Sequence, residues 1–190
     1  YTDPANLGRP DLRPEHGWSL DTGADVSRGA WTGAVTVFGR WDRDVIDWVR
    51  ASTADLWRSS NVRDVTTRGV EAAATRRWRR AQIRAAYTRL DVTAPSLTLL
   101  SKYVLEYATD SLATSVAAPL GRSPLVVSTT VDARRRTDGQ RYALVNARLG
   151  ATRGRLTLHV DASNLFDVTY REIAGVAMPG RWILAGVTLR

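Results

Sequence analysis

Few residues of this sequence have the types and spacing that chemistry at a site requires. His159 and Asp161 stand two residues apart, so in a strand they would share one face and could bind a metal ion. The only other histidine, His16, belongs to the far end of the sequence. A row of Arg155, His159 and Asp161 facing a wet lumen explains the pattern more simply, and we predict no metal site.

Acidic residues at 42–47 and a run of arginines are the next candidates. Asp42, Asp44 and Asp47 could do acid–base work, but the sequence supplies no nucleophile beside them. The run ARRR at 133–136 could bind lipopolysaccharide phosphates through bidentate arginine contacts, and a solvated charge run explains it equally well. Dinucleotide-binding, Walker, zinc-protease and nucleophile-elbow patterns do not occur. We therefore predict no catalytic residue, no cofactor and no enzymatic activity.

Composition limits the protein class further. The 190 residues, 44% hydrophobic, suit one domain, and the lack of cysteine excludes disulfides and Cys-based metal sites. The formal net charge of +8 would suit nucleic acid, an anionic membrane or an acidic ligand. We favour a plainer origin, an arginine-rich proteome, since Lys102 is the only lysine. The sequence predicts neither a transmembrane helix nor a signal peptide.

Apolar and polar residues alternate along most of the chain, which is typical of strands with one apolar face. Segments 143–150, 155–162 and 182–190 show this most clearly. The predicted apolar face includes Leu156, Leu158, Val160, Ile183, Ala185, Val187 and Leu189. The opposite face includes Arg155, Thr157, His159 and Asp161. Segment 45–57 is ambiguous, a short helix or a strand that continues into a loop.

The connections between these strands alternate between short and long. Short ones are expected near 27–30, 76–80, 119–123 and 150–154. Long ones are expected at 1–15, 49–57, 92–101, 133–140 and 164–180. In a meander every second connection lies on the same side, so one side has tight turns and the other long loops. Outer-membrane barrels have this asymmetry, with short periplasmic turns and longer extracellular loops.

Strand length and aromatic positions agree with a barrel. About 10 residues per strand, tilted near 45°, cover an apolar band of about 25 Å. Tryptophan and tyrosine favour membrane interfaces because the ring is apolar while its N–H or O–H needs water. Aromatics lie near the expected strand ends at Trp18, Trp31, Trp41, Trp48, Trp57, Trp78, Tyr103, Tyr142 and Trp182.

The loop between the last two strands carries a recognisable pattern. The string VDASNLFDVTYREIAGVAMPGRW at 160–182 resembles the C-terminal signature of TonB-dependent outer-membrane receptors. The matching residues are Asn164, Leu165, Phe166, Asp167, Tyr170, Pro179, Gly180 and Arg181. Asn164 and Asp167 suit a turn that leaves a strand. We expect Leu165 and Phe166 to pack on the barrel rim, and Pro179 with Gly180 to start the last strand.

Three earlier segments resemble the same family in the same order. The matching residues are Leu12, Pro14 and Glu15, then Phe38, Asp44 and Ile46, then Asn61, Val62, Gly69, Val70 and Glu71. Segments YVLEYATDSL and RYALVNARLG resemble later strands of the family. No single motif is decisive, but five in register make the resemblance strong.

The resemblance implies an all-β fold, an antiparallel up-and-down meander of about nine strands that forms part of a transmembrane β-barrel. Residues 1–190 would be the C-terminal portion of that barrel, without the plug domain and the earlier strands. The family takes up scarce bulky nutrients across the outer membrane, such as ferric siderophores or cobalamin-like compounds. The implied partners are the ligand, outer-membrane lipid and lipopolysaccharide, and the TonB energy-coupling complex acting on the missing plug; nucleic acid is not one of them.

Two alternatives remain open. A soluble basic β-domain could bind single-stranded nucleic acid through arginines and aromatics, but its basic residues should gather on one face. A complete small barrel could serve as an anchor or adhesin. The apparent count of nine strands argues against closure, because single-chain bacterial barrels have even strand numbers. The chain ends in Arg190, where family members usually end in an aromatic residue.

Overall fold

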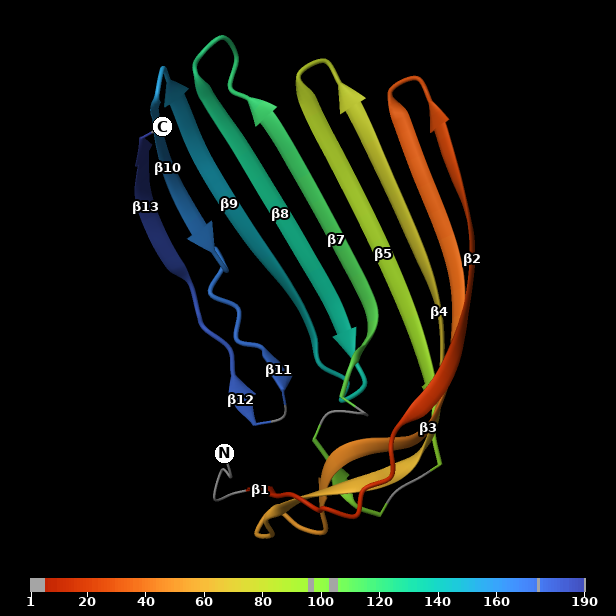
Figure 1. The fold of residues 1–190 in the computed structure, drawn as a ribbon. Helices are drawn as coiled ribbons and strands as arrows, with labels where there is room; N and C mark the ends of the chain where they lie inside the picture. Colours follow the sequence, from red (N-terminus) through yellow and green to blue (C-terminus); the bar gives the residue numbers. More distant parts are fainter. Residues whose placement is uncertain (1–5, 96–97, 103–105, 174, 190) are drawn as a thin grey trace.

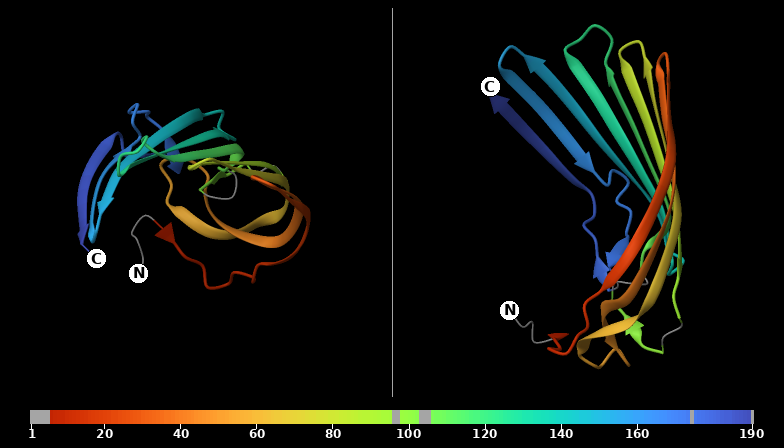
Figure 2. Two further views of the ribbon diagram at one scale, coloured as in Figure 1. Left: turned by 90° about the horizontal axis from the view of Figure 1, so that it is seen from above. Right: turned by 45° about the vertical axis from the view of Figure 1, so that its right-hand side comes forward.

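The computed structural model describes residues 6–95, 98–102, 106–173 and 175–189. These residues form one large curved sheet, whose nine long strands are antiparallel and which is open at both edges, and a separate two-stranded sheet (Figures 1 and 2). None of the described residues belongs to a helix long and apolar enough to cross a membrane.

Nine strands follow one another across the wall in sequence order, which confirms the predicted meander. Their bounds are β2 His16–Arg28, β3 Trp31–Arg50, β4 Trp57–Trp78, β5 Ala81–Thr93, β7 Ala108–Pro119, β8 Leu125–Arg136, β9 Arg141–Arg153, β10 Leu156–Ser163 and β13 Trp182–Leu189. Among the described residues, β2 and β13 each pair on one side only, so the barrel wall is partial.

Four short strands lie on the loop side of this wall. β1 (Asn6–Leu7) pairs with β4 and β6 (Leu100–Ser101) pairs with β3, on parts of β3 and β4 that extend past the wall. That extension bends across the concave side of the sheet (Figures 1 and 2). A separate hairpin, β11 (Arg171–Ile173) with β12 (Val176–Ala177), lies in the last loop. Segment 45–57 is therefore a strand continuing into a loop, not a helix.

The two faces of the sheet follow the predicted alternation. Leu158 of β10 lies opposite Val187 of β13 and Ala151 of β9, and Val160 lies opposite Ala185 and Leu149. Directly opposite residues share a face, so these apolar side chains form one surface. His159 and Asp161 fall on the other face, while Arg155 lies in the turn before β10.

Two of the long connections differ from expectation. Segment 133–140, predicted as a long loop, is mostly strand, because Arg136 and Arg141 belong to β8 and β9. The remaining tight turn is closed by bonds from Arg136 N to Gln140 O and from Gly139 N to Arg136 O, with Gly139 at φ 85°. The β3–β4 excursion owes its length to paired strands rather than to a loop. The four short turns lie together on the opposite side, as predicted.

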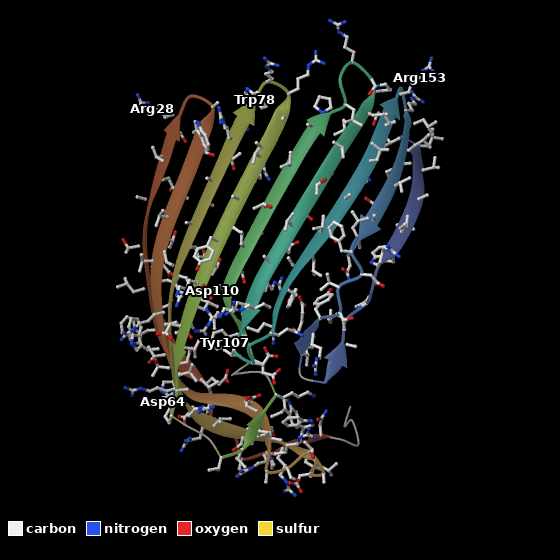
Figure 3. All side chains as sticks on the ribbon, turned by 180° about the vertical axis from the view of Figure 1, so that it is seen from behind. Arg28, Asp64, Trp78, Tyr107, Asp110 and Arg153 are labelled. Carbon is white, nitrogen blue, oxygen red and sulfur yellow. The ribbon has the colours of Figure 1, made fainter. Side chains whose placement is uncertain are left out.

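Four tryptophans mark the borders of an apolar band. Trp31 and Trp41 stand on the outer face of β3, about 10 residues apart, the length needed to span about 25 Å at a tilt near 45°. Trp41 stacks on Trp18 at 4.0 Å, and Trp78 lies at the turn edge (Figure 3).

The other aromatics depart from the predicted girdle. Tyr142 and Trp182 lie on the polar face by their strand register. Trp48 and Trp57 belong to the extension past the wall, and Tyr103 lies outside the described residues. A position near a strand end therefore does not identify an interface aromatic by itself. The side chain must also lie on the outer face of the sheet.

Candidate functional site

Asn164 organises the start of the last loop. Its side chain is almost buried, at 4% exposure, with the backbone at φ 48°. Its amide group donates to Val168 O at 2.8 Å and accepts from Val168 N at 2.9 Å. The backbone N–H of Asn164 donates to Asn146 of β9 at 3.0 Å. A short polar side chain that tolerates positive φ is what this turn needs.

Asp167 connects that turn to the start of β13. It also has positive φ, at 56°, and accepts the backbone N–H of Arg181 at 2.7 Å. A Cβ at Gly180 would stand 2.6 Å from the same carboxylate, so a larger residue there would have to displace it. Phe166 does not pack on the rim as expected, because its side chain is 70% exposed, while Leu165 is half-buried.

The β11–β12 hairpin docks on the polar face of β8 and β9. Glu172 accepts from Arg134 at 2.8 Å and from the Tyr142 hydroxyl at 3.4 Å. Tyr170 packs against Tyr142, with ring centroids 4.9 Å apart. These contacts hold the last loop against the inner wall instead of leaving it free above the rim.

Strand alternation divides the arginine run at 133–136. Arg134 points inward to the hairpin, and Arg136 is buried with one N–H donated to Glu106 O at 3.2 Å. Arg135 alone of the three is exposed, on the outer face. The run therefore does not form the cluster that a phosphate site of adjacent arginines would require.

His159 and Asp161 do meet on the polar face. The His159 Nε2 lies 3.6 Å from the Asp161 carboxylate, and Arg148 Nε lies 3.5 Å from it. The imidazole stacks against Gly186 of β13, where an added Cβ would stand 2.4 Å from the ring. This row bridges β9, β10 and β13, while Arg155 remains apart in its turn.

The three aspartates at 42–47 are separated and individually bound. Asp42 pairs with Arg40 at 2.7 Å, and Asp44 pairs with Arg13. Asp47 is 2% exposed and accepts the Ser101 hydroxyl and its neighbour's N–H. Each carboxylate has its own partners, so the three do not form a catalytic pair.

A cavity of about 790 Å³ opens on the loop-side extension of β3 and β4. Arginines dominate its polar lining, with Arg9, Arg50 and Arg58 against the single carboxylate of Asp55. Asp55 is already occupied by the hydroxyl and backbone N–H of Ser52, at 2.8 Å each. The cavity therefore offers positive charge to a ligand.

Two contacts orient Arg50 in this cavity. Its guanidinium lies 4.2 Å from the centroid of the Trp57 ring and donates to Thr53 O at 3.1 Å. Its Nε is buried without a hydrogen-bond partner. Arg9 is oriented by Asp11, whose pKa is lowered by that hydrogen bond. A guanidinium is suited to carboxylate or other oxyanion groups.

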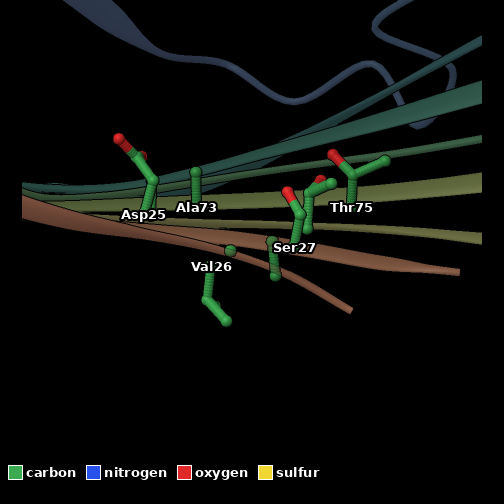
Figure 4. Close-up of a pocket in the computed structure, with 9 residues that line it drawn as sticks. Asp25, Val26, Ser27, Ala73 and Thr75 are labelled. Atoms are coloured by element: carbon green, nitrogen blue, oxygen red, sulfur yellow. The ribbon is translucent and has the colours of Figure 1, made fainter. Parts of the chain in front are cut away.

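The polar face holds a second, shallower concavity of about 350 Å³ near the turn side. Figure 4 shows Asp25, Ser27 and Thr75 on one side of the strands and Val26 on the other. Small and hydroxylated residues line it, and it carries no concentrated charge. Its lining follows from the alternation of side chains along the strands and does not indicate a binding site.

Comparison with protein families decides among the alternatives. The model described as "TonB dependent receptor-like, beta-barrel" matches residues 1–173. The chain belongs to the TonB-dependent receptor family. Members of this family are β-barrels of the outer membrane, so the open sheet is part of such a barrel's wall.

Solved structures of TonB-dependent receptors share this fold at low sequence identity. The FrpB iron transporter from Neisseria meningitidis is 12% identical, with TM-score 0.70, over 97% of this chain and 32% of its own. The copper transporter OprC is 14% identical, with TM-score 0.74, over 96% of this chain and 33% of its own. The siderophore receptor PirA from Acinetobacter baumannii is 14% identical, with TM-score 0.73, over 97% and 33%. This chain spans about a third of their length. No curated protein matches it significantly.

The motifs that resemble the receptor family contact one another in the structure. Glu15 accepts the backbone N–H of Ile46. Asn61 donates to the carbonyls of Asp44 at 2.6 Å and Arg13 at 2.9 Å. These bonds anchor the segment before β2 to the bulge where β3 and β4 leave the wall.

A further motif pair lies within the wall. An added Cβ at Gly69 would stand 2.3 Å from the Phe38 ring, so the glycine makes room for that ring. Sequence reasoning placed these residues in separate motifs. Their shared purpose in shaping the wall and its extension appears only in three dimensions.

Replacing Asn164 should destabilise the receptor measurably. Asn164→Ala removes two hydrogen bonds to Val168 and places alanine, which has no polar side chain to stabilise a positive φ, at this position. The free energy of unfolding should therefore fall by about 2–4 kcal/mol. Glycine adopts a positive φ without strain, so Asn164→Gly should lower the free energy of unfolding by only about 1–3 kcal/mol. Urea unfolding of the full-length receptor in vesicles measures both. Equal losses for the two variants would show that the backbone conformation contributes nothing.

Proposed function

We propose that this chain is the C-terminal portion of the barrel of an outer-membrane transporter for a scarce bulky nutrient, a ferric siderophore or a cobalamin-like compound. Its contribution is barrel wall, extracellular loops and the closing strand, over residues 1–190. Family membership supports transport, and several solved structures of the same fold are named as iron, copper or siderophore transporters and receptors.

The observation that carries this proposal is the arginine-lined cavity on the loop side. Ferric siderophores commonly present oxyanion groups, and the Arg50 guanidinium, which lies over the Trp57 ring, lines this cavity. The cavity lies beyond the Trp18–Trp41 border of the apolar band, where ligands arrive from outside. The partners we propose are the TonB complex, acting through a plug, and outer-membrane lipid and lipopolysaccharide.

Nucleic-acid binding finds no support. That alternative required the basic residues on one face of a soluble sheet, whereas arginines here occupy both faces, the turns and the extension. The related structures are transporters and receptors rather than enzymes, and the described residues offer no catalytic arrangement to set against them.

Ligand binding by the full-length receptor tests the proposal. Arg50→Gln should weaken binding of an anionic ferric siderophore about tenfold or more, because a charge-assisted hydrogen bond is lost. Arg141→Gln, an exposed change of the same charge outside the cavity, should leave binding unchanged. Ligand titration by intrinsic fluorescence and growth of a receptor-deleted strain on each nutrient measure the effects. Failure of the wild-type receptor to bind or import any of these nutrients would contradict the proposal.

A further inference from the structure

The turn-side edge of the wall carries a concentration of unpaired positive charge. Eight arginines lie within three residues of the four short turns: Arg28, Arg76, Arg77, Arg79, Arg80, Arg122, Arg153 and Arg155. No aspartate or glutamate lies within the same distance of those turns. All eight are exposed, and Figure 3 shows Arg28, Trp78 and Arg153 along this one edge. We call these eight residues the turn-side arginine rim.

The opposite edge has a different charge arrangement. Five ion pairs lie toward the loop side, including Arg13–Asp44, Arg89–Asp110 and Arg134–Glu172. The two remaining ion pairs both involve Asp161, on the polar face. None of the ion pairs of the described residues includes a member of the rim. An arginine-rich composition alone would not leave the positive charge at one edge without counter-charge.

Three members of the rim face the lipid side. Arg28 and Arg76 both lie opposite Trp31, and Arg153 lies opposite Leu156 of the apolar face. Two arginines of the rim also lie over girdle tryptophans, Arg76 over Trp31 at 4.8 Å and Arg79 over Trp78 at 5.6 Å. Tryptophan rings lie at headgroup depth, so guanidinium groups stacked on them lie at the depth of lipid phosphates.

We propose that the turn-side arginine rim binds the phosphate headgroups of anionic phospholipids in the leaflet that surrounds the short turns. Guanidinium groups bind phosphate through paired N–H donors, and the outward members reach it from the lipid side of the wall. A soluble acidic protein could reach the turns, but it could not reach Arg28, Arg76 and Arg153 past the headgroups. The proposal goes beyond transport and holds whichever nutrient is carried.

The test uses the full-length receptor in zwitterionic micelles, titrated with phosphatidylglycerol or phosphatidylcholine, with bound lipids counted by native mass spectrometry. Each arginine near an anionic surface strengthens binding about fivefold, so three should give about a hundredfold preference for phosphatidylglycerol at low salt. The triple variant R28Q/R76Q/R153Q should lose most of this preference. The variant R43Q/R141Q/R171Q removes the same charge from exposed loop-side positions outside the cavity and should keep it.

Two further measurements make the result decisive. The wild-type preference should fall steeply between about 0.05 and 0.5 M salt, which can be measured even if the variant fails to fold. Inorganic phosphate at millimolar concentration should not compete, because the site needs headgroups fixed at the membrane edge. Equal binding of the two lipids by the wild type, or equal loss in both variants, overturns the proposal.

Discussion

Residues 1–190 expressed by themselves, without detergent, should aggregate rather than form a soluble monomer. The described sheet has two open edges, at β2 and β13, and unpaired edges are templates for pairing with other chains. Among the described hydrophobic residues only Val49, Val65 and Tyr142 are buried, so the sheet has almost no core of its own.

The surface area gives the size of the effect. The chain exposes 13406 Å². A compact monomer of 21.0 kDa should expose about 9,000 Å². The excess is the surface that lipid and the rest of the barrel would cover. A bilayer does not rescue the fragment, because each unpaired backbone group at an edge costs several kcal/mol in lipid.

Sedimentation after expression without detergent measures this prediction, and a salt titration against single-stranded DNA separates it from the nucleic-acid alternative. We expect pelleted aggregate, or oligomers in detergent that close the edges against each other. A monodisperse soluble monomer with binding that weakens steeply as salt rises would contradict membership of a membrane wall.

The wall itself could be predicted from the sequence because its rule is local. Each strand residue faces the side opposite its neighbour, so the apolar face through Leu158, Val160 and Val187 follows from alternation alone. The family signature likewise consists of turn residues whose conformations are set by their own side chains, as Asn164 and Asp167 show.

The loop side could not be predicted because its contacts join distant segments. Three consecutive charged residues, Asp42, Arg43 and Asp44, interrupt the alternation after Trp41, but this break does not reveal that the strand continues and bends away from the wall. The bend depends on a bulge at Asp44 and on bonds from Glu15 and Asn61 that bridge long stretches of sequence. The cavity around Arg50 exists only because of that bend, and sequence analysis did not identify it.

A charge placed on the lipid face at mid-bilayer should destabilise the wall strongly. Val37 lies on the outer face of β3, one position from the midpoint between Trp31 and Trp41, and is 53% exposed. Val37→Arg should therefore destabilise the full-length receptor by about 2–4 kcal/mol, the cost of an arginine at the bilayer midplane.

Moving the arginine to the adjacent inward position, Thr36→Arg, keeps the depth and changes only the face. It lies opposite Glu71, which can pair with it, so it should cost less than about 1 kcal/mol. Urea unfolding in vesicles measures both variants, with the heat-dependent migration of the barrel on gels as the readout of folding. Equal losses at the two positions would mean that this face of β3 does not meet lipid.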